Sequence, residues 1–247
     1  RRFGGYEITE ILYSDERSSE YLAKRYLIEG DPGRYRIRTW RLDPNLPRES
    51  QEKQKAVIMR PTEAVLKIGS HPNLLRVLQF EFSDEDHEFF EVTEWSEFGT
   101  LHGYLSNRGR GELTLRERLE IAEGVAAALE AVHAHGVVHR NLSPATIQIG
   151  FDRKPRLTDF DRAYIESKQT VYAASYSHHV DPAYIPPELA DPSHYEFDTA
   201  SDMYSLGVLI YRLLADEVPF VDARDAKAKN GRPAFLPSAK REGVGSA

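Results

Sequence analysis

Residues 138–144 read Val-His-Arg-Asn-Leu-Ser-Pro, and the stretches on either side of them decide how the chain folds. Upstream, Thr114 and Glu117 have the spacing of a capping box, in which each side chain binds a free backbone N–H at a helix start. Apolar residues then recur at helical spacing as far as Gly136, a residue that favours a helix end. They are Leu115, Leu119, Ala122, Ala126, Leu129 and Val132. The quoted stretch therefore follows a long amphipathic helix.

Downstream of that stretch, the sequence predicts a hairpin and then a second helix. Two short strand-like runs, Thr146–Ile149 and Arg156–Thr158, flank turn-forming residues 150–155. A buried helix is expected over residues 201–215, with Met203, Leu206, Ile210 and Leu213 on its apolar face. Residues 221–247 are rich in Ala, Lys, Arg and Gly and are expected to form a polar tail.

The first third of the chain is expected to consist mostly of strands. Five runs have the alternation or apolar content of short strands: Tyr6–Leu12, Glu20–Tyr26, Arg34–Leu42, Leu74–Phe82 and Phe89–Trp95. Residues 48–68 are expected to be helical, with Pro61 kinking or splitting the helix because proline lacks a backbone N–H. Strands first and helices later predict an α+β protein with two lobes.

The composition excludes several classes of function. The 247 residues carry a net charge of −7 without a long Lys/Arg run, so this domain is not expected to bind nucleic acid. The absence of cysteine excludes disulfides, thiolate catalysis and Cys-based zinc sites, and it is compatible with a reducing, cytoplasmic location. No apolar run approaches the ~18 residues of a membrane helix, so no membrane partner is expected.

Five short motifs make the chain resemble a protein kinase domain. In chain order they are residues 71–74 (His-Pro-Asn-Leu), 138–144, 158–161 (Thr-Asp-Phe-Asp), 184–188 (Tyr-Ile-Pro-Pro-Glu) and 201–207 (Ser-Asp-Met-Tyr-Ser-Leu-Gly). They resemble the turn after the regulatory helix, the catalytic loop, the metal-binding DFG, the end of the activation segment and the start of the central helix. Each motif alone is weak, but five in the family's order are specific.

The resemblance implies an α+β, two-lobed kinase-like fold. We expect residues 6–98 to form a small antiparallel-sheet N-lobe with the hinge, and residues 99–220 to form part of a helical C-lobe. Kinases continue with further helices, whereas residues 221–247 offer a polar tail, so the fold is expected to be truncated there.

The catalytic loop departs from the kinase pattern at three positions. Asn141 stands where a kinase has the Asp that accepts the hydroxyl proton, and an amide cannot accept a proton at neutral pH. Loss of a general base alone costs ~10²–10⁴ in rate. Ser143 replaces the phosphate-contacting Lys, and Thr146 replaces the Asn that helps to hold a second metal ion.

Three other residues match the kinase pattern, His139 and Arg140 in this loop and Asp202 at the start of the central helix. His139 is expected to tie backbone segments together, as it does in kinases, and Asp202 to hold the loop's backbone. For Arg140 two hypotheses stay open: it pairs with a phosphorylated activation segment, or it is a fixed hydrogen-bonding group. The candidate phosphorylation sites of that segment are Thr170, Tyr172, Ser175 and Ser177.

The phosphate-binding positions of the nucleotide site are altered as well. The three glycines of the kinase phosphate-covering loop correspond to Tyr13, Asp15 and Ser18. Glycine serves there because the backbone must approach the phosphates closely, and Asp15 adds a like charge. Trp40 is aligned with the phosphate-anchoring Lys of the third strand, and shifted alignments place Arg38 or Arg41 there.

Other parts of a nucleotide site are retained. Thr93 corresponds to the gatekeeper, and Glu94 and Ser96 lie in the hinge, so an adenine could stack in the cleft. Asp159 corresponds to the DFG metal ligand, with a purely structural role as the alternative. The resemblance therefore implies ATP with Mg²⁺ as a weak ligand at most.

These losses together predict a pseudokinase, a catalytically inactive or severely impaired module that acts as a binding or regulatory domain. The loop variant resembles bacterial kinase-like domains that adjoin other enzymatic regions, and the chain begins at Arg1 without Met, as expected of a fragment of a larger protein. Expected partners are other domains of that polypeptide, another protein or a second copy. The alternatives are a weak or atypical Ser/Thr kinase, a nucleotide transferase using Asp159, and a structural spacer that binds no nucleotide.

Overall fold

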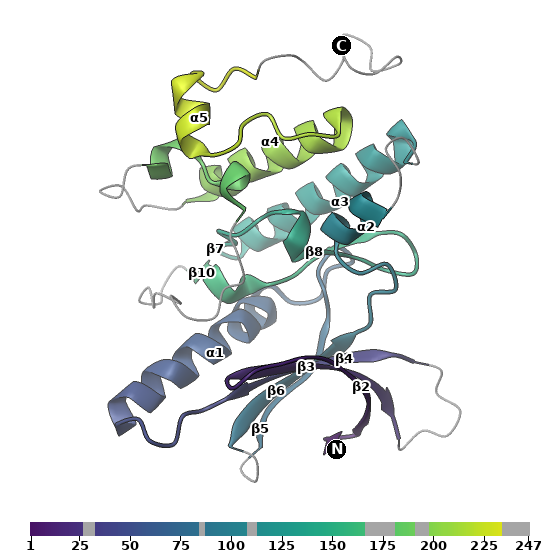
Figure 1. Cartoon of the computed structure of the whole chain (residues 1–247), viewed down its shortest axis with the longest axis vertical. Helices are drawn as coiled ribbons and strands as arrows, with labels where there is room; N and C mark the ends of the chain where they lie inside the picture. Colours follow the sequence, from purple (N-terminus) through teal and green to yellow (C-terminus); the bar gives the residue numbers. More distant parts are fainter. Residues whose placement is uncertain (27–32, 84–86, 108–112, 166–180, 191–197, 234–247) are drawn as a thin grey trace.

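The chain folds into a sheet and a group of helices at opposite ends of the molecule (Figure 1). The computed structural model describes residues 1–26, 33–83, 87–107, 113–165, 181–190 and 198–233. The N-terminus lies in the sheet, and helix α1 (Arg48–Ile68) runs beside it toward the helical part (Figure 1). This arrangement confirms the predicted α+β class with a small antiparallel-sheet lobe and a helical lobe.

The N-lobe sheet has six antiparallel strands in the order β1-β2-β3-β4-β6-β5. They are β1 (Arg2–Phe3), β2 (Tyr6–Ser14), β3 (Ser18–Arg25), β4 (Tyr35–Arg41), β5 (Val77–Ser83) and β6 (Glu88–Glu94). All five predicted strands are present, with ends that differ from the prediction by at most three residues. The short β1 was not predicted.

The alternation of side chains along β4 gives the sheet two chemically different faces. One face carries Tyr35, Ile37 and Thr39, which are buried, and the other carries Arg36, Arg38 and Trp40. The buried face packs in an aromatic core with β2, β3 and β6. The opposite face points toward the helical lobe, where Arg38 contacts Asp159. The charged side of the sheet therefore faces the helical lobe, and the region around the Arg38–Asp159 contact is called the cleft below.

Helix α1 continues through Pro61, so the expectation that this proline would split the helix is wrong. Proline removes one helical hydrogen bond, but Pro61 and its neighbour Thr62 are buried in the packing of the helix. Ala64 and Ile68 join the main core of the helical lobe. Burial of this face compensates for the missing bond and places α1 against the segment that follows Asp159.

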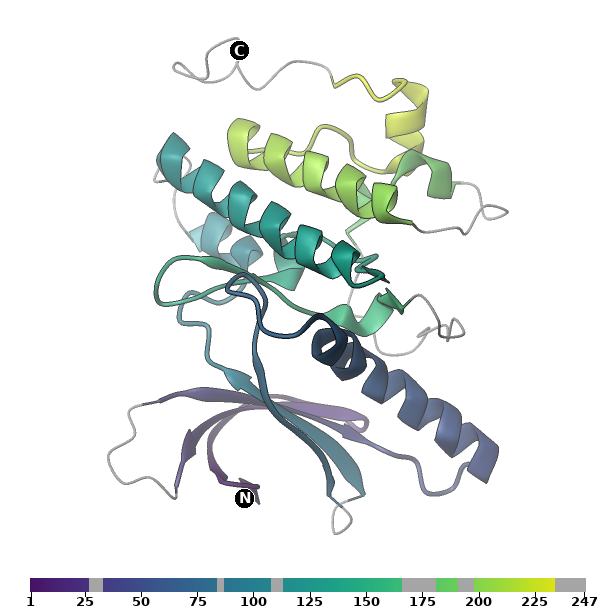
Figure 2. The same ribbon diagram turned by 180° about the vertical axis from the view of Figure 1, so that it is seen from behind.

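The helical lobe is built around α3 and α4, which lie side by side (Figure 2). Its helices are α2 (Leu101–Asn107), α3 (Leu115–Ala134), α4 (Thr199–Ala215) and α5 (Ala223–Ala228). Its short strands and 3₁₀ turns are β7 (Val137–Val138), η1 (Pro144–Thr146), β8 (Ile147–Ile149), β9 (Pro155–Leu157), η2 (Phe160–Arg162), β10 (Tyr164–Ile165), η3 (Pro182–Tyr184) and η4 (Pro187–Ala190). β8 pairs with β9 as predicted, and β7 pairs with β10.

The predicted capping box at the start of α3 is confirmed, but two predicted core positions are wrong. Thr114 accepts the backbone N–H of Glu117, whose side chain binds the backbone N–H of Thr114 in return. Leu119 is 42% exposed and Met203 is 52% exposed. In α4 the buried stripe instead includes Asp202 and neighbouring small polar residues, because this helix anchors a loop as well as the core.

Part of the segment expected to be a polar tail is a helix. Residues 223–228 form α5, capped by Asp222, whose carboxylate accepts the backbone N–H of Asp225 at 2.8 Å. Ala223 and Ala226 are buried, and α5 packs against η4 and η3. Small alanines can be buried without an apolar run, which is why composition alone suggested a tail.

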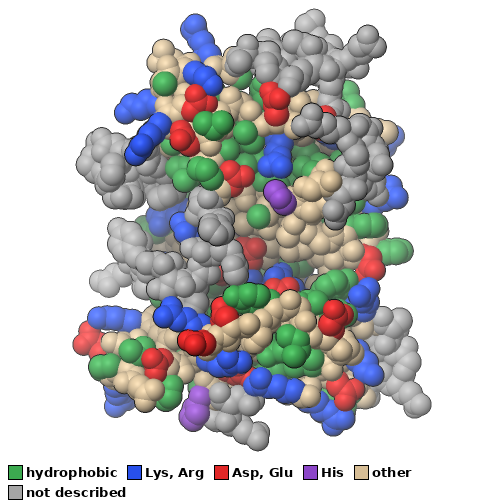
Figure 3. Space-filling view, in the orientation of Figure 1, with side chains coloured by type: hydrophobic (Ala, Val, Ile, Leu, Met, Phe, Trp, Pro, Cys, Tyr) green, Lys and Arg blue, Asp and Glu red, His purple; other side chains and the backbone are tan. Residues whose placement is uncertain are grey.

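The surface carries mixed charge on the face seen in Figure 3, where Lys and Arg side chains are interspersed with Asp and Glu. Within the described ranges, no helix combines the length and the apolar character needed to cross a membrane.

Candidate functional site

The carboxylate of Asp202, near the start of α4, holds the loop of residues 138–144. Asp202 accepts the backbone N–H groups of His139 and Arg140, both at 2.8 Å, through its two different oxygens. Nε2 of His133 in α3 also lies 2.8 Å from the Asp202 carboxylate. The Asp202 side chain is 1% exposed, and these contacts compensate for the burial of its charge. The structure thus gives Asp202 the predicted scaffold role.

His139 connects this loop to the segment that precedes Asp159. Its Nε2 lies 2.8 Å from the carbonyl oxygen of Thr158, and its Nδ1 lies 3.3 Å from the backbone N of Asn141. A carbonyl only accepts and a backbone N–H only donates, so the imidazole is neutral with its proton on Nε2. Burial lowers the pKa of His139, although the Asp202 carboxylate opposes this shift. The ring packs edge-on against Phe160, so His139 contacts both the loop and the DFD segment.

Thr146 and Ser143, two of the altered catalytic-loop positions, use their side chains within the loop itself. The Thr146 hydroxyl lies 3.0 Å from the carbonyl oxygens of both Asn141 and Ser143, and it accepts the backbone N–H of Ser143 at 3.1 Å. The Ser143 hydroxyl accepts the backbone N–H of Ala145 at 3.3 Å. Both side chains are buried. Both hydroxyls therefore stabilise the loop from within.

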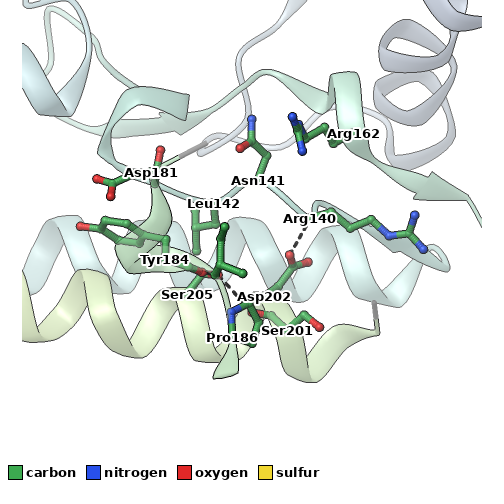
Figure 4. A pocket seen from close by; sticks show the side chains of 12 residues that line it. Arg140, Asn141, Leu142, Arg162, Asp181, Tyr184, Pro186, Ser201, Asp202 and Ser205 are labelled. Atoms are coloured by element: carbon green, nitrogen blue, oxygen red, sulfur yellow. Dashed lines mark hydrogen bonds between the residues drawn. The ribbon is translucent and has the colours of Figure 1, made fainter. Parts of the chain in front are cut away.

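Asn141 and Arg162 line a small cavity of about 80 Å³ beside α4, whereas the guanidinium of Arg140 points away from Asn141 (Figure 4). The Arg140 guanidinium lies over the ring of Tyr164, with 4.6 Å between its carbon and the ring centroid. This contact favours a fixed Arg140. The candidate phosphorylation sites Thr170, Tyr172, Ser175 and Ser177 lie outside the described residues, so the pairing of Arg140 with a phosphate stays a prediction.

Arg38, and not Trp40, is the residue of the third kinase-like strand that reaches the position of the DFG aspartate. One guanidinium nitrogen of Arg38 lies 2.7 Å from Asp159, and another lies 2.7 Å from Glu91 on β6. The three side chains are 15%, 24% and 4% exposed, respectively. Trp40 lies two residues further along the strand, with its ring 5.3 Å from the Arg38 guanidinium carbon. This contact favours the shifted alignment, which places Arg38 at the lysine position.

The charges around Arg38 shift the pKa values of Arg38, Asp159 and Asp161. Burial alone would lower the pKa of Arg38, but the Glu91, Asp159 and Asp161 carboxylates raise it well above its ordinary value. Burial raises the pKa of Asp159, and the Arg38 and Arg36 guanidinium groups outweigh burial and lower it. Asp161 behaves oppositely, because burial and the nearby Asp159 charge raise its pKa to about 6. Arg38 thus stabilises the ionised form of Asp159, whereas burial and the Asp159 charge disfavour the ionised form of Asp161.

A second ion pair lies beside the first on the same face of the sheet. Arg36 on β4 donates two hydrogen bonds of 2.7 Å to the two oxygens of Glu20 on β3. The pair is bidentate and mostly buried, with 18% and 28% exposed side chains. The Arg36 and Glu20 side chains therefore cover this part of the sheet. An adenine ring bound against the sheet would meet this ion pair and not a flat apolar surface.

The loop between β2 and β3 binds its own carboxylate. Asp15 accepts the backbone N–H groups of Arg17 and Ser18 at 2.8 and 2.7 Å and the phenol of Tyr13 at 2.6 Å. The Tyr13 hydrogen bond and these backbone donors lower the pKa of Asp15 to about 2. Arg41 ties the loop down by donating to the carbonyl oxygen of Asp15 at 2.8 Å. The backbone N–H groups of Arg17 and Ser18, which could bind a phosphate, thus already bind the Asp15 carboxylate.

The hinge positions remain compatible with a small ligand. Thr93 is 3% exposed, and its hydroxyl has no hydrogen-bond partner among the described residues. Glu94 is exposed, and Ser96 is buried with its carbonyl oxygen accepting the N–H of Gly99 at 3.0 Å. Trp95 donates its backbone N–H to the carbonyl oxygen of Arg34 at 3.1 Å.

The metal-ligand position of the DFD motif is already ion-paired within the chain. No group of three His, Asp or Glu side chains in the described ranges could hold a metal ion. Asp159, the predicted metal ligand, has one oxygen 2.7 Å from the Arg38 guanidinium, and Thr146 binds the loop backbone. A divalent ion at Asp159 would compete with the Arg38 guanidinium for this carboxylate.

The sequence pattern that defines the protein kinase domain matches residues 45–238. The chain belongs to the protein kinase family. The serine/threonine-protein kinase PrkC of Bacillus subtilis is 26% identical over 246 residues, which cover 96% of this chain and 35% of PrkC. The serine/threonine-protein kinase GIN4 of Saccharomyces cerevisiae is 28% identical over 156 residues, which cover 63% of this chain and 13% of GIN4. The chain thus spans about a third of PrkC and a smaller part of GIN4.

Within the kinase family, two signals in the sequence could have identified Arg38 and its neighbours. Kinases carry Val-Ala-Ile-Lys on the third strand, and Ile37 directly precedes Arg38. This register puts Arg36 at the alanine position. The Val that follows the last glycine of the phosphate-covering loop corresponds to Glu20. Two small or apolar kinase positions are therefore replaced by the two members of one ion pair.

Proposed function

We propose that this kinase domain does not transfer phosphate and acts as a binding or regulatory module of a larger protein. The observation that carries the proposal is the pairing of Arg38 with both Asp159 and Glu91 at 2.7 Å. The Arg38 guanidinium thus supplies, from within the chain, the positive charge that a metal ion would supply at Asp159. Asp159 and Glu91 therefore have their counter-ion without a bound magnesium nucleotide.

The charge of the cleft supports the proposal. Its cations are Arg36 and Arg38, and its carboxylates are Glu20, Glu91, Asp159 and Asp161. Even with Asp161 partly protonated, the carboxylates outnumber the cations. Two like charges about 4 Å apart repel by ~4 kcal/mol at an effective dielectric near 20. Polyphosphate is therefore disfavoured here, and Asp15 adds a further negative charge in the covering loop.

The catalytic loop supports the same conclusion by chemistry. The Asn141 amide cannot take up the proton of an acceptor hydroxyl at neutral pH. Ser143 and Thr146 carry no charge, and their hydroxyls stabilise the loop. Catalysis of phosphoryl transfer consists almost entirely of positioning and electrostatic stabilisation, and these three loop positions no longer carry groups for either.

A test with restored residues separates a missing base from an unsuitable cleft. Transfer of labelled phosphate from ATP with Mg²⁺ to the protein itself and to a generic Ser/Thr substrate is measured for the wild type and an Asn141→Asp/Ser143→Lys variant. We expect no transfer from either protein, because the variant keeps the Arg38 and Arg36 ion pairs. Transfer by the wild type would contradict the proposal, and activity of the restored variant alone would show that the cleft accepts ATP and that the defect lies in the catalytic loop.

A slow serine/threonine kinase or a nucleotide transferase is the second candidate, and the intact scaffold favours it. Asp202, His139 and Phe160 hold the loop and the DFD segment together, and Asp159 adopts a left-handed backbone conformation with φ of 61°. Label transfer by the wild type that disappears in an Asp159→Asn variant would establish this candidate.

The binding partner is proposed to be another domain of the same polypeptide or a separate protein, with a second copy as a further option. A cytoplasmic location and a bacterial origin stay predictions. Comparing the thermal stability of the domain alone with that of longer chains containing it tests the first option, because a partner that binds only the folded state raises its stability.

A further inference from the structure

Residues 1–3 lie as a strap on the face of the N-lobe sheet that points away from the helical lobe (Figure 1). The Phe3 side chain is buried in the aromatic core, with its ring centroid 5.2 Å from that of Phe90. The carbonyl oxygen of Arg1 accepts the backbone N–H of Ile8 at 3.0 Å. Both the backbone and the side chains of this strap therefore attach it to the sheet.

The strap covers a carboxylate that is shielded from water. Glu88 lies on β6 two residues before Phe90, so its side chain is on the face that carries the aromatic core, and it is 0% exposed. The Arg1 guanidinium binds one oxygen of this carboxylate. Burial of a charge is costly unless the charge is paired, so Arg1 stabilises the ionised Glu88 in this position.

The other oxygen of the Glu88 carboxylate faces a second cation. Arg41 lies directly opposite Glu88 in the register of β4 and β6, and its Nε is 3.8 Å from this oxygen. That distance is within the range of an ion pair and too long for a hydrogen bond. Among the described residues this oxygen accepts no hydrogen bond. Arg41 is therefore the cation next in line for Glu88 if Arg1 leaves.

Arg41 uses its hydrogen-bond donors on the loop between β2 and β3, residues 14–18, which corresponds to the kinase phosphate-covering loop. Its Nη1 donates to the carbonyl oxygen of Asp15 at 2.8 Å and lies 3.3 Å from that of Glu16. Its Nη2 donates to the hydroxyl of Ser19 at 3.3 Å. A guanidinium is planar and moves as one unit. Moving Nε into hydrogen-bond distance of Glu88 therefore shifts the donors that hold the loop.

We propose that the strap controls the covering loop through Glu88. With the strap in place, Arg1 neutralises Glu88 and Arg41 stays on the loop. When the strap leaves, Arg41 becomes the counter-ion of Glu88, and the loop loses its side-chain ties to β4. A partner that binds residues 1–3 thereby frees the loop above the cleft. This control does not depend on the proposed lack of phosphate transfer, because it concerns only the conformation of the loop.

A single spin label on the covering loop tests this control, because the chain contains no cysteine. The label is attached through Glu16→Cys, at an exposed side chain, and electron paramagnetic resonance of the complete chain gives the fraction of mobile label. Arg1→Met should increase this fraction by about two-fold or more, because the buried carboxylate then draws Arg41 from the loop. Arg1→Met/Glu88→Gln should restore the wild-type spectrum, because a neutral amide does not require a counter-ion.

Arg2→Met is the matched control, because it removes the same charge from the neighbouring residue of the strap. Arg2 is 59% exposed and pairs with Glu7 on the surface at 3.6 Å. The spectrum of this variant should equal that of the wild type. Arg41→Met removes the tie itself, so its label should be mobile, and adding Arg1→Met should increase the mobility no further.

Three results would overturn this role of the strap. They are an unchanged spectrum in Arg1→Met, equal changes in Arg1→Met and Arg2→Met, and a label that stays mobile in Arg1→Met/Glu88→Gln. Circular dichroism shows whether each variant folds. If Arg1→Met does not fold, Glu88→Gln and Arg41→Met decide: an immobile label in the first and a mobile label in the second support the strap's role, and any other combination overturns it. ATP is absent throughout, so none of these results bears on phosphate transfer.

Discussion

Replacing Arg38 by Met should destabilise this domain strongly, because it removes the counter-ion of two mostly buried carboxylates. Arg38 contacts Glu91 and Asp159 at 2.7 Å, and the Glu91 side chain is 4% exposed. Removing one partner of a buried ion pair costs about 3–5 kcal/mol, because the other charge stays buried and unpaired. For a domain of this size 1 kcal/mol changes Tm by about 2–4 °C, so we expect Tm to fall by about 6–20 °C.

The loss should depend on pH with a defined sign. Arg38 and Arg36 lower the pKa of Asp159 against the effect of burial. This stabilisation is present above the ordinary pKa of an aspartate, and it is lost as pH falls through the lowered value. The difference in Tm between wild type and Arg38→Met should therefore be large at pH 7 and shrink toward pH 4, where unpaired carboxylates become protonated.

Thermal unfolding followed by circular dichroism at several pH values measures both effects. Arg116→Met is the control, because that arginine is 87% exposed and forms only a surface pair, so its Tm should stay within about 1 °C of the wild type. A double variant, Arg38→Met/Glu91→Gln, should recover part of the loss, since no unpaired charge remains on β6. A change in Tm as small as that of the control, at every pH, would refute the role given to Arg38.

Three further changes test other parts of the structure by the same unfolding assay. Asp161→Asn should stabilise the domain at pH 7, because the rise of the Asp161 pKa from 3.8 to about 6 destabilises the folded state by at most about 3 kcal/mol. The gain in stability should vanish as pH falls from 6 to 4. A gain that persists at pH 4 would contradict this reasoning. Asp202→Asn should cost about 2–3 kcal/mol, since an amide cannot accept both loop N–H groups, whereas Asp198→Asn keeps a good helix cap and should be near neutral. Gly124→Ala should destabilise by about 1–2 kcal/mol through its contact with Pro155, while an alanine at Gly207 of α4 meets nothing within 4 Å and should be neutral or stabilising; equal effects would contradict the close packing.

Local chemistry explains why much of this fold could be predicted from the sequence. The capping residues Thr114 and Glu117 fix the start of α3 through contacts that are only three residues apart. Helix α1 has the predicted bounds, Arg48 to Ile68, because its sequence favours a helix on both sides of Pro61. The loop around His139 was predictable because its motifs occur in the order of the kinase family.

Side-chain partners that come from distant strands could not be predicted in the same way. Arg38 and Asp159 are 121 residues apart, and which side chain of β4 faces the cleft depends on a register that a one-residue shift would reverse. The carboxylate of Asp15 was expected to repel a phosphate, and the structure shows it bound to the donors that a phosphate would need. Helix α5 escaped prediction because its two buried residues are alanines in a charged segment.

Equilibrium binding of ATP with Mg²⁺ to the purified domain tests the central claim most directly. With Arg38 on Asp159 and Arg36 on Glu20, isothermal titration up to millimolar nucleotide should show no saturable heat, and Tm should stay constant. A ligand at 100 times its Kd would stabilise the fold by ~2.7 kcal/mol. A saturable signal in the micromolar range that requires Mg²⁺ and disappears in Asp159→Asn would contradict the account.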